Sequence, residues 1–355
     1  MKSIYNSNQW LADLDRIIAE FRMISELEGK SVLITGAAGL VCSAFTDILI
    51  RYNETHDGKI KILAAGRWKD EMTDRFGIYS NRDYFTYIPY DATKTSNTFD
   101  IPSDYIIHGA SNASPSMIAK EPVETLLSNC LGIKMLLDYA LGCGAQRILY
   151  ISSSEVYGKK NDNKPFHEGE YGFIDQLNPR NSYSVGKRAA ETLCASYADE
   201  YGVSTVIVRP GHIYGPTASK NDNRVSSVWS YNAAEGKNIV MKSDGTQLRS
   251  YCYCLDCASA ILTVLLRGKE TSAYNISNPN AIISIRELAE TLAEAGKVEV
   301  VYEIPSDSER RSFNPMSNSS LDSTSLEKLG WKGIFDAKAG LSHTVKVLCD
   351  MSAES

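Results

Sequence analysis

The sequence lacks a net positive charge. Its 355 residues carry 37 lysines and arginines against 43 aspartates and glutamates, which gives a formal net charge of -6 at pH 7. A chain with this balance has no overall basic field that would attract nucleic acid or an anionic membrane surface. We therefore expect no nucleic-acid partner, and an anionic small ligand would need a local site.

An N-terminal segment with the pattern of a signal peptide and a long apolar run are also absent. The segment Met1–Trp10 is polar and does not follow the basic-then-apolar order of a signal peptide. No later apolar run approaches the roughly 18 to 20 residues that cross a bilayer. These absences predict a cytoplasmic protein with no membrane partner.

The sequence also has few groups of residues at the spacing of metal ligands. Eight cysteines are spread over a chain that is far longer than a small disulfide scaffold, which favours reduced thiols. Cys252, Cys254 and Cys257 form the only tight cluster, and no second group of ligands at zinc spacing lies nearby. We expect these three to be buried small side chains on a strand and a helix start, and we predict no metal site.

What the sequence does contain is an alternation of apolar strands and helices. Apolar residues recur at helical spacing over 10–28, which predicts an N-terminal helical extension over residues 1–29. Between residues 30 and 210 the alternation is typical of an α/β fold with a Rossmann-like, doubly wound parallel sheet. The strands are expected near 31–35, 59–65, 105–108, 147–152 and 204–209. Residues 211–355 are predicted to form mainly a smaller C-terminal substrate-binding domain, with some segments that return to the core.

A loop of small residues joins the first predicted strand to the next helix. In this loop, GAAGLVC, backbone N–H groups can approach a pyrophosphate at the positive N-terminus of the helix. Gly36, Ala38, Gly39 and Leu40 are therefore candidate contacts of a dinucleotide, although two glycines at this spacing also fit a plain tight turn. Cys42 stands where a third glycine is often found, and its small side chain still permits close packing of helix and strand.

The end of the second predicted strand carries no acidic residue. An Asp or Glu at this point commonly accepts hydrogen bonds from an NAD ribose, but the sequence reads Ala65-Gly66-Arg67. Arg67 is compatible with two roles, pairing with the 2′-phosphate of NADP or lying solvated at the surface. Asp91, after the next apolar segment, fits either an adenine contact or a turn aspartate. The cofactor is thus predicted as NAD(H) or NADP(H), without a decision between them.

A tyrosine and a lysine suit acid-base chemistry. Tyr183 and Lys187 lie four apart at the start of a predicted helix, so their side chains share one face. A nearby ammonium is expected to bring the pKa of the phenol down from about 10, so that it can accept a hydroxyl proton. A pair at this spacing also arises by chance. The catalytic interpretation of this pair is strengthened by the preceding strand. That buried strand ends near Ser153 and Glu155, whose hydroxyl and carboxylate would face the same crevice.

Several arginines fall where an anionic ligand could bind. Gly245 to Ser250 precedes an apolar strand and includes Arg249, while Arg209 and Arg224 lie on predicted crevice edges. The planar guanidinium fork binds two oxygens of a diphosphate at once. Any one of these arginines taken alone is more often a surface residue than a ligand.

Together these residues resemble the NAD-dependent epimerase/dehydratase family, the extended branch of the short-chain dehydrogenases. The resemblance runs from about Ser31 to Trp331. The motifs that carry it are Thr35 to Gly39, Ser152 to Gly158, Tyr183 to Lys187, Arg209 to Pro216, Gly245 to Ser250 and Leu329 to Trp331.

The resemblance implies roles for individual residues. It implies a catalytic triad of Ser153, Tyr183 and Lys187, with Lys187 also at the nicotinamide ribose. Gly36 and Gly39 would flank the cofactor pyrophosphate, and Arg249 would grip the nucleotide diphosphate. The segment from His212 to Pro216 would lie beside nicotinamide and sugar. Further expected contacts are Ala110 and Asp91 for the cofactor and Ser111, Ser154, Arg224 and Arg310 for the substrate.

Within the family, the segment from His108 to Pro115 looks most like UDP-glucuronate decarboxylases. These enzymes usually pair a Thr-Ser-Glu segment with a later arginine. Here Ser153-Ser154-Glu155 has serine for threonine, and the later arginine would be Arg310 or Arg311, outside the usual Arg-Lys-Pro setting. Ser154 argues against dTDP-glucose 4,6-dehydratases, which carry Asp there, whereas Arg67 keeps a GDP-mannose-type dehydratase open.

The implied reaction is a transient oxidation at C4 of a nucleotide sugar by bound NAD(P)⁺. The keto sugar then loses CO₂, loses water or takes the hydride back on its other face, so decarboxylase, 4,6-dehydratase and 4-epimerase share one constellation. An NADPH-dependent 4-keto-sugar reductase and a non-catalytic dinucleotide-binding protein are the other readings. Apolar helices near 117–143 and 183–201 predict a homodimer, although packing on the sheet requires the same apolar faces.

Overall fold

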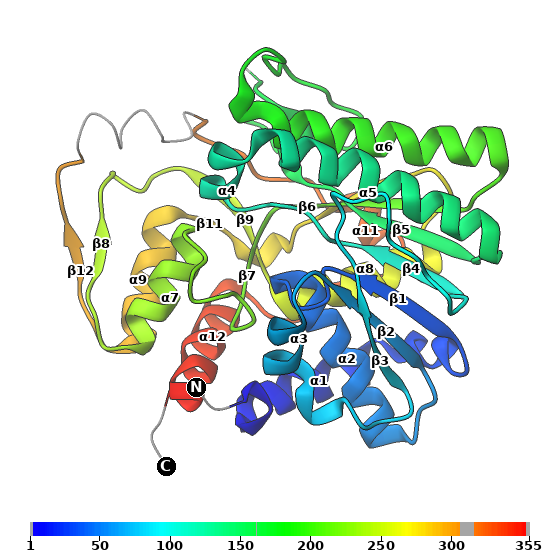
Figure 1. Cartoon of the computed structure of the whole chain (residues 1–355). Coiled ribbons are helices and arrows are strands. Elements are labelled where there is room, and N and C mark those ends of the chain that lie inside the picture. Colours follow the sequence, from blue (N-terminus) through cyan, green and yellow to red (C-terminus); the bar gives the residue numbers. More distant parts are fainter. Residues whose placement is uncertain (1–2, 161, 306–315, 353–355) are drawn as a thin grey trace.

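The computed structural model describes residues 3–160, 162–305 and 316–352. Seven parallel strands form the central sheet in the order β3-β2-β1-β4-β5-β6-β10 (Figure 1). Their bounds are β1 Ser31–Thr35, β2 Lys61–Gly66, β3 Phe85–Pro89, β4 Tyr105–His108, β5 Arg147–Ile151, β6 Thr205–Pro210 and β10 Ala273–Ile276. The strand order reverses between β1 and β4, as in a doubly wound fold, so the predicted fold class is confirmed.

Both faces of the sheet are covered, which explains why its strands read as continuous apolar runs. On one face, Val32 and Ile34 of β1 share a core with α1, α2, α3 and α8. On the other face, Leu33 shares a core with α5 and α6. The helices are α1 Asn8–Glu20, α2 Leu40–His56, α3 Lys69–Phe76, α5 Pro122–Cys143, α6 Ser182–Tyr201 and α8 Cys254–Arg267.

The N-terminal segment is bound to the body of the molecule. Helix α1 is followed by a 3₁₀ helix, Arg22–Leu27, and the two are separated at Phe21, whose ψ of 60° is not helical. The expectation of one helical pattern over 10–28 is therefore corrected to two elements. Trp10 and Ile17 are fully buried, and the Ser7 hydroxyl donates to Asp350 near the C-terminus at 2.6 Å.

The C-terminal part builds two small sheets and also returns to the main one. Strand β10 pairs with β6 at the edge of the central sheet. The small sheets contain β7 His212–Tyr214, β9 Leu248–Tyr253 and β11 Ile282–Ser284 in one, and β8 Ile239–Met241 and β12 Val300–Tyr302 in the other. Helices α7 Val225–Ala234, α9 Ile285–Gly296, α11 Thr324–Glu327 and α12 Ala337–Ser352 complete this part.

Helix α5 corrects the expectation about apolar length. The stretch predicted near 117–143 is divided into α4, Pro115–Lys120, and α5, because Glu121 precedes a proline and leaves the helical region. By length and composition α5 could cross a membrane, with a mean hydropathy of 1.2 over its best window. Lys134 and Asp138 interrupt the run, so it is not visible as a continuous apolar segment. Its buried face, including Ile133 and Leu136, packs in the core beside β4 and β5.

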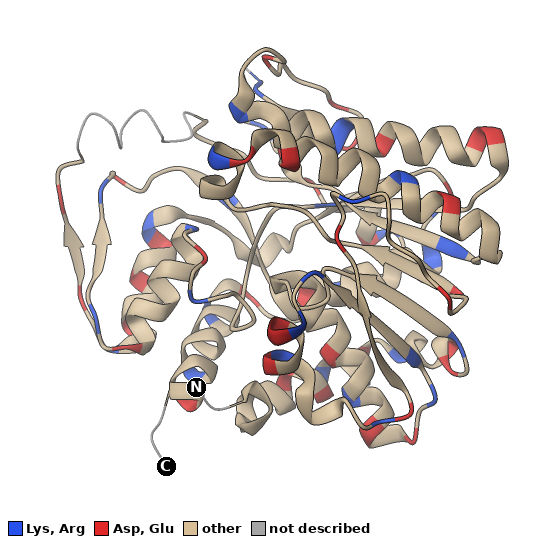
Figure 2. Ribbon diagram, in the orientation of Figure 1, with Lys and Arg blue, Asp and Glu red and all other residues tan. Residues whose placement is uncertain are grey.

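Charged side chains of both signs are mixed over the surface. Figure 2 shows lysines and arginines interspersed with aspartates and glutamates across both parts of the chain. This distribution agrees with the absence of a basic stripe in the sequence. Any recognition of an anionic ligand therefore depends on individual cations at the carboxyl edge of the sheet, where the loops after parallel strands meet.

Candidate active site

The loop between β1 and α2 has the backbone geometry that close approach requires. Gly36 has a φ of 69°, and a Cβ atom at this position would lie 2.9 Å from the Cα atom of Ala110. Gly39 is the N-cap of α2, so the first free N–H groups of that helix face the loop. A side chain at Gly36 would fill the space between the loops that follow β1 and β4. The loop therefore fits the pyrophosphate of a dinucleotide.

A cavity of about 200 Å³ opens beside this loop. It brings together seven residues that the sequence singled out: Gly36, Ala38, Gly39, Arg67, Asp91, Ala110 and Ser111. Leu40 does not line it, and its carbonyl accepts a hydrogen bond from Thr217 at 2.8 Å. The cavity also contains residues that sequence reasoning missed: Gly66, Trp68, Glu71, Met72, Tyr90, Ala92, Thr93, Gly109, Asn112 and Ser128. Many of these residues directly follow β2, β3 or β4, so the rule that the carboxyl ends of parallel strands face the ligand would have found them. Glu71, Met72 and Ser128 lie on helices, and the sequence gives no indication that they face the cavity.

Asp91 is fixed by its own loop. Its carboxylate accepts hydrogen bonds from the backbone N–H and the hydroxyl of Thr93, at 3.1 and 2.8 Å, and Lys94 lies 3.8 Å away. Desolvation alone would raise the pKa of Asp91, but the hydrogen bonds from Thr93 and the charge of Arg67 outweigh it and hold the pKa below its usual value. A carboxylate held in this way remains ionised at neutral pH.

The catalytic candidates meet at the end of β5. Ser153 caps a short 3₁₀ helix, accepting the backbone N–H of Glu155 at 3.2 Å, and the Ser184 hydroxyl donates to the Glu155 carboxylate at 3.2 Å. The Ser153 hydroxyl also forms a hydrogen bond with the phenol of Tyr183. The structure therefore places Ser153, Glu155 and Tyr183 within one group. Ser154 is half-buried in the same 3₁₀ helix.

The expected decrease in the pKa of Tyr183 is wrong for this structure. Burial raises the pKa of the phenol to about 12, and the Glu155 carboxylate raises it further, while Ser153 and Arg224 act in the opposite direction. Desolvation therefore outweighs the nearby cations. At neutral pH the phenol keeps its proton in this state.

Lys187 lies beneath the tyrosine on the same helix face. Its ammonium donates to the carbonyl of Ile151 at 2.7 Å and lies 4.7 Å from the ring centre of Tyr150 and 5.5 Å from that of Tyr183. Burial lowers the pKa of Lys187 to about 7, although Glu191 counteracts it. A buried lysine with this pKa is a group that can exchange a proton near neutral pH.

His108 completes the buried wall of the site. Its Nδ1 atom lies 2.7 Å from the Thr35 hydroxyl, whereas its Nε2 atom is buried with no hydrogen-bond partner among the described residues. Burial, and then the charge of Lys187, lowers the pKa of His108 to about 3, so the imidazole stays neutral. Asn112 has a buried amide nitrogen that is likewise unpartnered within the described part of the chain.

Arg209 is not available to a ligand. Its guanidinium binds the Glu191 carboxylate through two hydrogen bonds of 2.9 and 2.6 Å and is 2% exposed. Glu191 in turn accepts the Ser152 hydroxyl at 2.5 Å. The expectation that Arg209 lies on a crevice edge and binds a diphosphate is therefore corrected. The arginine ties β6 to α6 and to the end of β5.

Arg249 and Arg224 differ in their partners. Arg249 is 4% exposed, donates to the carbonyls of Leu248 and Met316 and has no carboxylate within 4.0 Å among the described residues. Arg224 is paired with Asp222. Its guanidinium donates three hydrogen bonds of 2.5 to 3.0 Å to the Asp222 carboxylate. Desolvation and these two arginines lower the pKa of His212, at the start of β7, to about 4. Burial and the two arginines therefore act together on His212 and keep its imidazole neutral.

The remaining candidates lie as follows. The Ser111 hydroxyl donates to Asn129 at 3.2 Å beside the cavity. Arg310, like Arg311, lies outside the described residues. Cys252, Cys254 and Cys257 are buried at the end of β9 and the start of α8, as expected, and burial raises the pKa of each thiol.

Comparisons with known proteins agree on the family. The model of the "NAD dependent epimerase/dehydratase family" matches residues 32–277. UDP-glucuronic acid decarboxylase 6 of Arabidopsis thaliana is 32% identical over 310 residues, which cover 87% of this chain and 86% of that protein. Two solved structures share the fold with a TM-score of 0.73 each. One is a UDP-glucose 4-epimerase from Thermotoga maritima with UDP-glucose, 22% identical, over 89% of this chain and 98% of that one. The other is a UDP-glucuronic acid 4-epimerase from Bacillus cereus with UDP-glucuronic acid and NAD, 19% identical, over 90% and 98% of the two chains.

Proposed function

The chain belongs to the NAD dependent epimerase/dehydratase family, and from this premise we propose that it is a UDP-glucuronate decarboxylase. It is an enzyme that uses a nicotinamide dinucleotide. The observation that carries the proposal is the meeting of Ser153, Tyr183 and Lys187 at the end of β5, beside the cavity of the β1–α2 loop. A bound nicotinamide supplies a hydride acceptor at sugar C4.

The chain's own residues supply the proton chemistry. Tyr183 Oη accepts the proton of the C4 hydroxyl, and the Ser153 hydroxyl keeps that oxygen in line through its hydrogen bond with the phenol. Because burial raises the pKa of Tyr183, the phenol needs a route by which its own proton leaves first. Lys187, with a pKa of about 7 on the same helix face, is the nearest group that can exchange protons at neutral pH.

Arg249 is the best candidate for the diphosphate. Among the described residues its buried guanidinium donates only to carbonyl oxygens, so it would gain most from an anionic ligand. Arg224 acts electrostatically on both Tyr183 and His212, which supports a role for it near the reacting group. Although Arg224 is paired with Asp222, part of its guanidinium remains available to a sugar carboxylate or a phosphate oxygen.

The C4 ketone determines the next bond to break. With a carboxylate on C5, the substrate becomes a β-keto acid, whose C5–C6 bond breaks and releases CO₂ with the electron pair passing to the ketone. The bond cleavage needs no base, but the resulting enolate must take a proton at C5 and C4 must regain its hydride, so that the product is lighter by CO₂ alone. The similarity to the Arabidopsis decarboxylase over most of both chains favours this outcome. Glu155 favours a 4,6-dehydratase as the second candidate, because a carboxylate next to Tyr183 and hydrogen-bonded only by Ser184 can remove a C5 proton.

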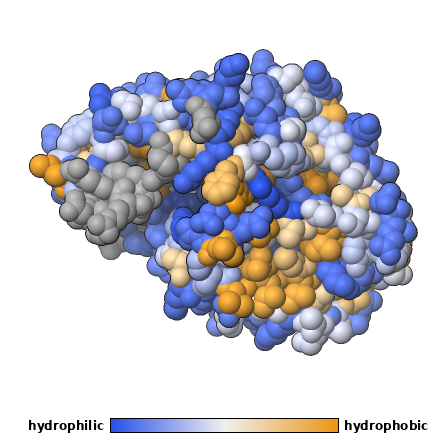
Figure 3. All heavy atoms as spheres, turned by 90° about the horizontal axis from the view of Figure 1, so that it is seen from above, coloured by the Kyte–Doolittle hydropathy of each residue, from blue (hydrophilic) through white to orange (hydrophobic). Residues whose placement is uncertain are grey.

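We propose that the enzyme is a homodimer that pairs through α5 and α6. Only 39% of the most apolar window of α5 is buried, and Val123, Leu127 and Leu141 are exposed on it. The face on which α5 and α6 lie carries an apolar area among polar surroundings (Figure 3). A second copy would cover it. Leu127→Glu should convert the dimer to a monomer in light scattering, and a monomeric wild type would contradict the dimer.

The compartment is part of the same proposal. All eight cysteines are free thiols, and Cys349 is exposed. Unpaired thiols in this number suit a reducing environment, and we place the enzyme in the cytoplasm.

The reaction is tested by incubating the purified enzyme with UDP-glucuronate. The expected result is release of CO₂ and a sugar nucleotide lighter by the mass of CO₂, with no product from Tyr183→Phe. UDP-glucose and dTDP-glucose serve as matched substrates without the carboxylate. Loss of water from either of them, with UDP-glucuronate unchanged, would replace the decarboxylase by the dehydratase. Inversion of UDP-glucuronate without loss of mass would instead establish a 4-epimerase.

A further inference from the structure

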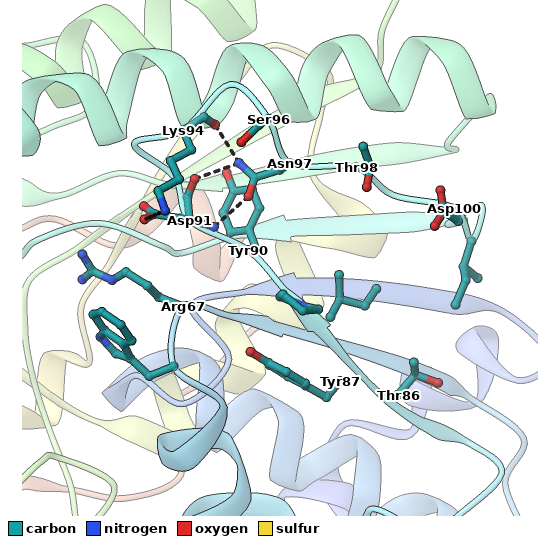
Figure 4. A pocket seen from close by; sticks show the side chains of 14 residues that line it. Arg67, Thr86, Tyr87, Tyr90, Asp91, Lys94, Ser96, Asn97, Thr98 and Asp100 are labelled. Atoms are coloured by element: carbon teal, nitrogen blue, oxygen red, sulfur yellow. Dashed lines mark hydrogen bonds and ion pairs between the residues drawn. The ribbon is translucent and has the colours of Figure 1, made fainter.

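A second cavity, of about 550 Å³, adjoins the one at the β1–α2 loop. The two share Arg67, Trp68, Tyr90 and Asp91, so they form one continuous depression that runs outward from the end of β2. The outer part lies between β3 and the loop that follows it (Figure 4). Most of the labelled side chains in Figure 4 are polar, and this part is therefore not an apolar pocket.

Arg67 lies at the junction of the two cavities. Its guanidinium carbon is 5.4 Å from the ring centre of Trp68, which is 56% exposed. No carboxylate lies within 4.0 Å of the guanidinium among the described residues, although Glu71 lines the same inner cavity. In Figure 4 its end group points toward the side on which Asp91 and Lys94 lie. The arginine is thus oriented by an aromatic ring and is not neutralised by an ion pair.

Two cations, Arg67 and Lys94, lie at this junction, although the carboxylates of Asp91, Glu71 and Asp100 also line the two cavities. The Asp91 carboxylate is already bound by Thr93, and Lys94 is 3.8 Å from it. One fixed carboxylate therefore stands between two cations, Arg67 and Lys94. An additional phosphate could therefore bind the planar guanidinium of Arg67 on one side and the ammonium of Lys94 on the other.

The position of this junction relative to the glycine loop identifies the phosphate. A dinucleotide whose pyrophosphate lies at Gly36 and Gly39 has its adenosine ribose at the end of β2. An acid at that point would accept the ribose hydroxyls, but β2 ends in Gly66 and continues with Arg67 and Trp68. We propose that the cofactor is NADP(H), with Arg67 as the residue that selects the 2′-phosphate and Lys94 as a second, weaker contact.

This inference rests on the proposed dinucleotide site but is independent of the sugar chemistry. Recognition of the 2′-phosphate adds charge-assisted hydrogen bonds that NAD cannot form. The added binding suits a cofactor that must stay in place while the sugar is oxidised and then reduced. It also means that relatives which carry NAD do not predict the cofactor of this chain.

The test measures binding, not turnover. Purified protein is freed of nucleotide and titrated with NADP⁺ and with NAD⁺ by isothermal titration calorimetry, and the nucleotide that copurifies is identified by mass spectrometry. NADP⁺ is expected to bind at least about tenfold more tightly. Arg67→Met should remove most of this preference by weakening NADP⁺ alone, Lys94→Met should weaken NADP⁺ by a smaller factor, and Arg67→Asp should reverse the preference. Arg51→Met, a surface arginine of α2 away from both cavities, is the matched control and should leave both affinities unchanged.

Each alternative outcome has a separate meaning. Equal or tighter binding of NAD⁺ by the wild type would overturn the selection of NADP(H) and leave the enzyme assignment intact. An Arg67→Met variant that weakens both dinucleotides equally would assign Arg67 to the shared part of the cofactor and would also overturn it. Absence of binding by either dinucleotide to folded protein would instead contradict the proposed function itself.

Discussion

Two buried polar clusters in this molecule differ in how completely their groups are paired. The back cluster, behind α2, consists of Tyr5, Trp10, Asp47 and Arg75. The Asp47 carboxylate accepts hydrogen bonds from all three of the others, and Arg75 also donates to the Tyr5 hydroxyl at 2.7 Å. The carboxylate is fully buried, and both of its oxygens are used. Every strong polar group at its centre has a partner.

The edge cluster, at the carboxyl ends of the strands, consists of His108, Ser153, Tyr183 and Lys187. The Nε2 atom of His108 has no partner among the described residues, and the hydrogen bond that Lys187 donates goes to a neutral carbonyl. Burial shifts the pKa of Tyr183 up and that of Lys187 down, in each case toward the uncharged form. The back cluster therefore satisfies its polar groups, whereas the edge cluster, which is at least as deeply buried, is left with unmet hydrogen-bonding capacity. Groups left in that state point to a ligand.

The largest expected effect comes from removing one oxygen of the edge cluster. Tyr183→Phe should reduce turnover by about 10²- to 10⁴-fold, because the C4 hydroxyl loses its proton acceptor. Its free energy of unfolding should change by only about 1 kcal/mol, since the phenol loses a single hydrogen bond, the one with Ser153. Tyr197→Phe on the same helix, which loses only a bond to Asp138, is the control. Steady-state kinetics and urea unfolding measure the two quantities, and a Tyr183→Phe enzyme that retained wild-type turnover would disprove the role of the phenol.

Breaking the back cluster should have the opposite signature. Asp47→Ala leaves Arg75 buried without its carboxylate and should lower the free energy of unfolding by about 3–5 kcal/mol. Turnover per folded molecule should stay close to that of the wild type. Denaturant unfolding gives the loss, and the double variant Asp47→Leu with Arg75→Met should recover part of it, because no charge is then left unpaired. A double variant as unstable as Asp47→Ala would mean that packing, not charge, holds this cluster.

Lys187→Met should make the protein more stable while it removes activity. The folded protein holds the pKa of Lys187 at about 7, against an ordinary value of 10.5, so the unfolded chain binds more protons between these values. Wild-type stability therefore rises as pH increases through this window. At pH 7 the variant should be more stable by about 1–3 kcal/mol, and the difference should shrink toward pH 10. Urea unfolding at both pH values measures this, and a gain that did not change with pH would exclude titration of Lys187 as its cause.

The edge cluster was largely predictable from the sequence and the back cluster was not. Ser153, Tyr183 and the glycine loop follow apolar strands or open helices, and in a parallel sheet those positions meet at one edge. Asp47, in contrast, reads as an ordinary acid within a helix. It becomes buried only because the N-terminal segment docks against α2, and nothing in the local pattern of either segment specifies that contact.

Arg209 shows the same limit at the site itself. Its position at the end of β6 suggested a ligand contact, but its partner, Glu191, lies on α6 one turn beyond Lys187. Only the packing of that helix on the sheet brings the two together. Strand-end reasoning therefore locates an active-site edge but does not separate the residues that bind ligands from those that hold the edge in shape.

The smallest expected effect isolates burial as the cause of the contrast. Arg51 of α2 binds Asp15 of α1 through two hydrogen bonds of 2.7 Å, so its chemistry matches that of the Asp47 and Arg75 pair, which joins α2 to α3. The Asp15 side chain, however, is 48% exposed. Because water solvates either charge when the other is removed, Arg51→Met should cost only about 0–1 kcal/mol, against several for Arg75→Met. The comparison is made by urea unfolding at low and high salt, where only the Arg51 pair should weaken. If both variants lost the same stability, docking of the N-terminal segment, not burial of the charge, would determine the strength of the back cluster.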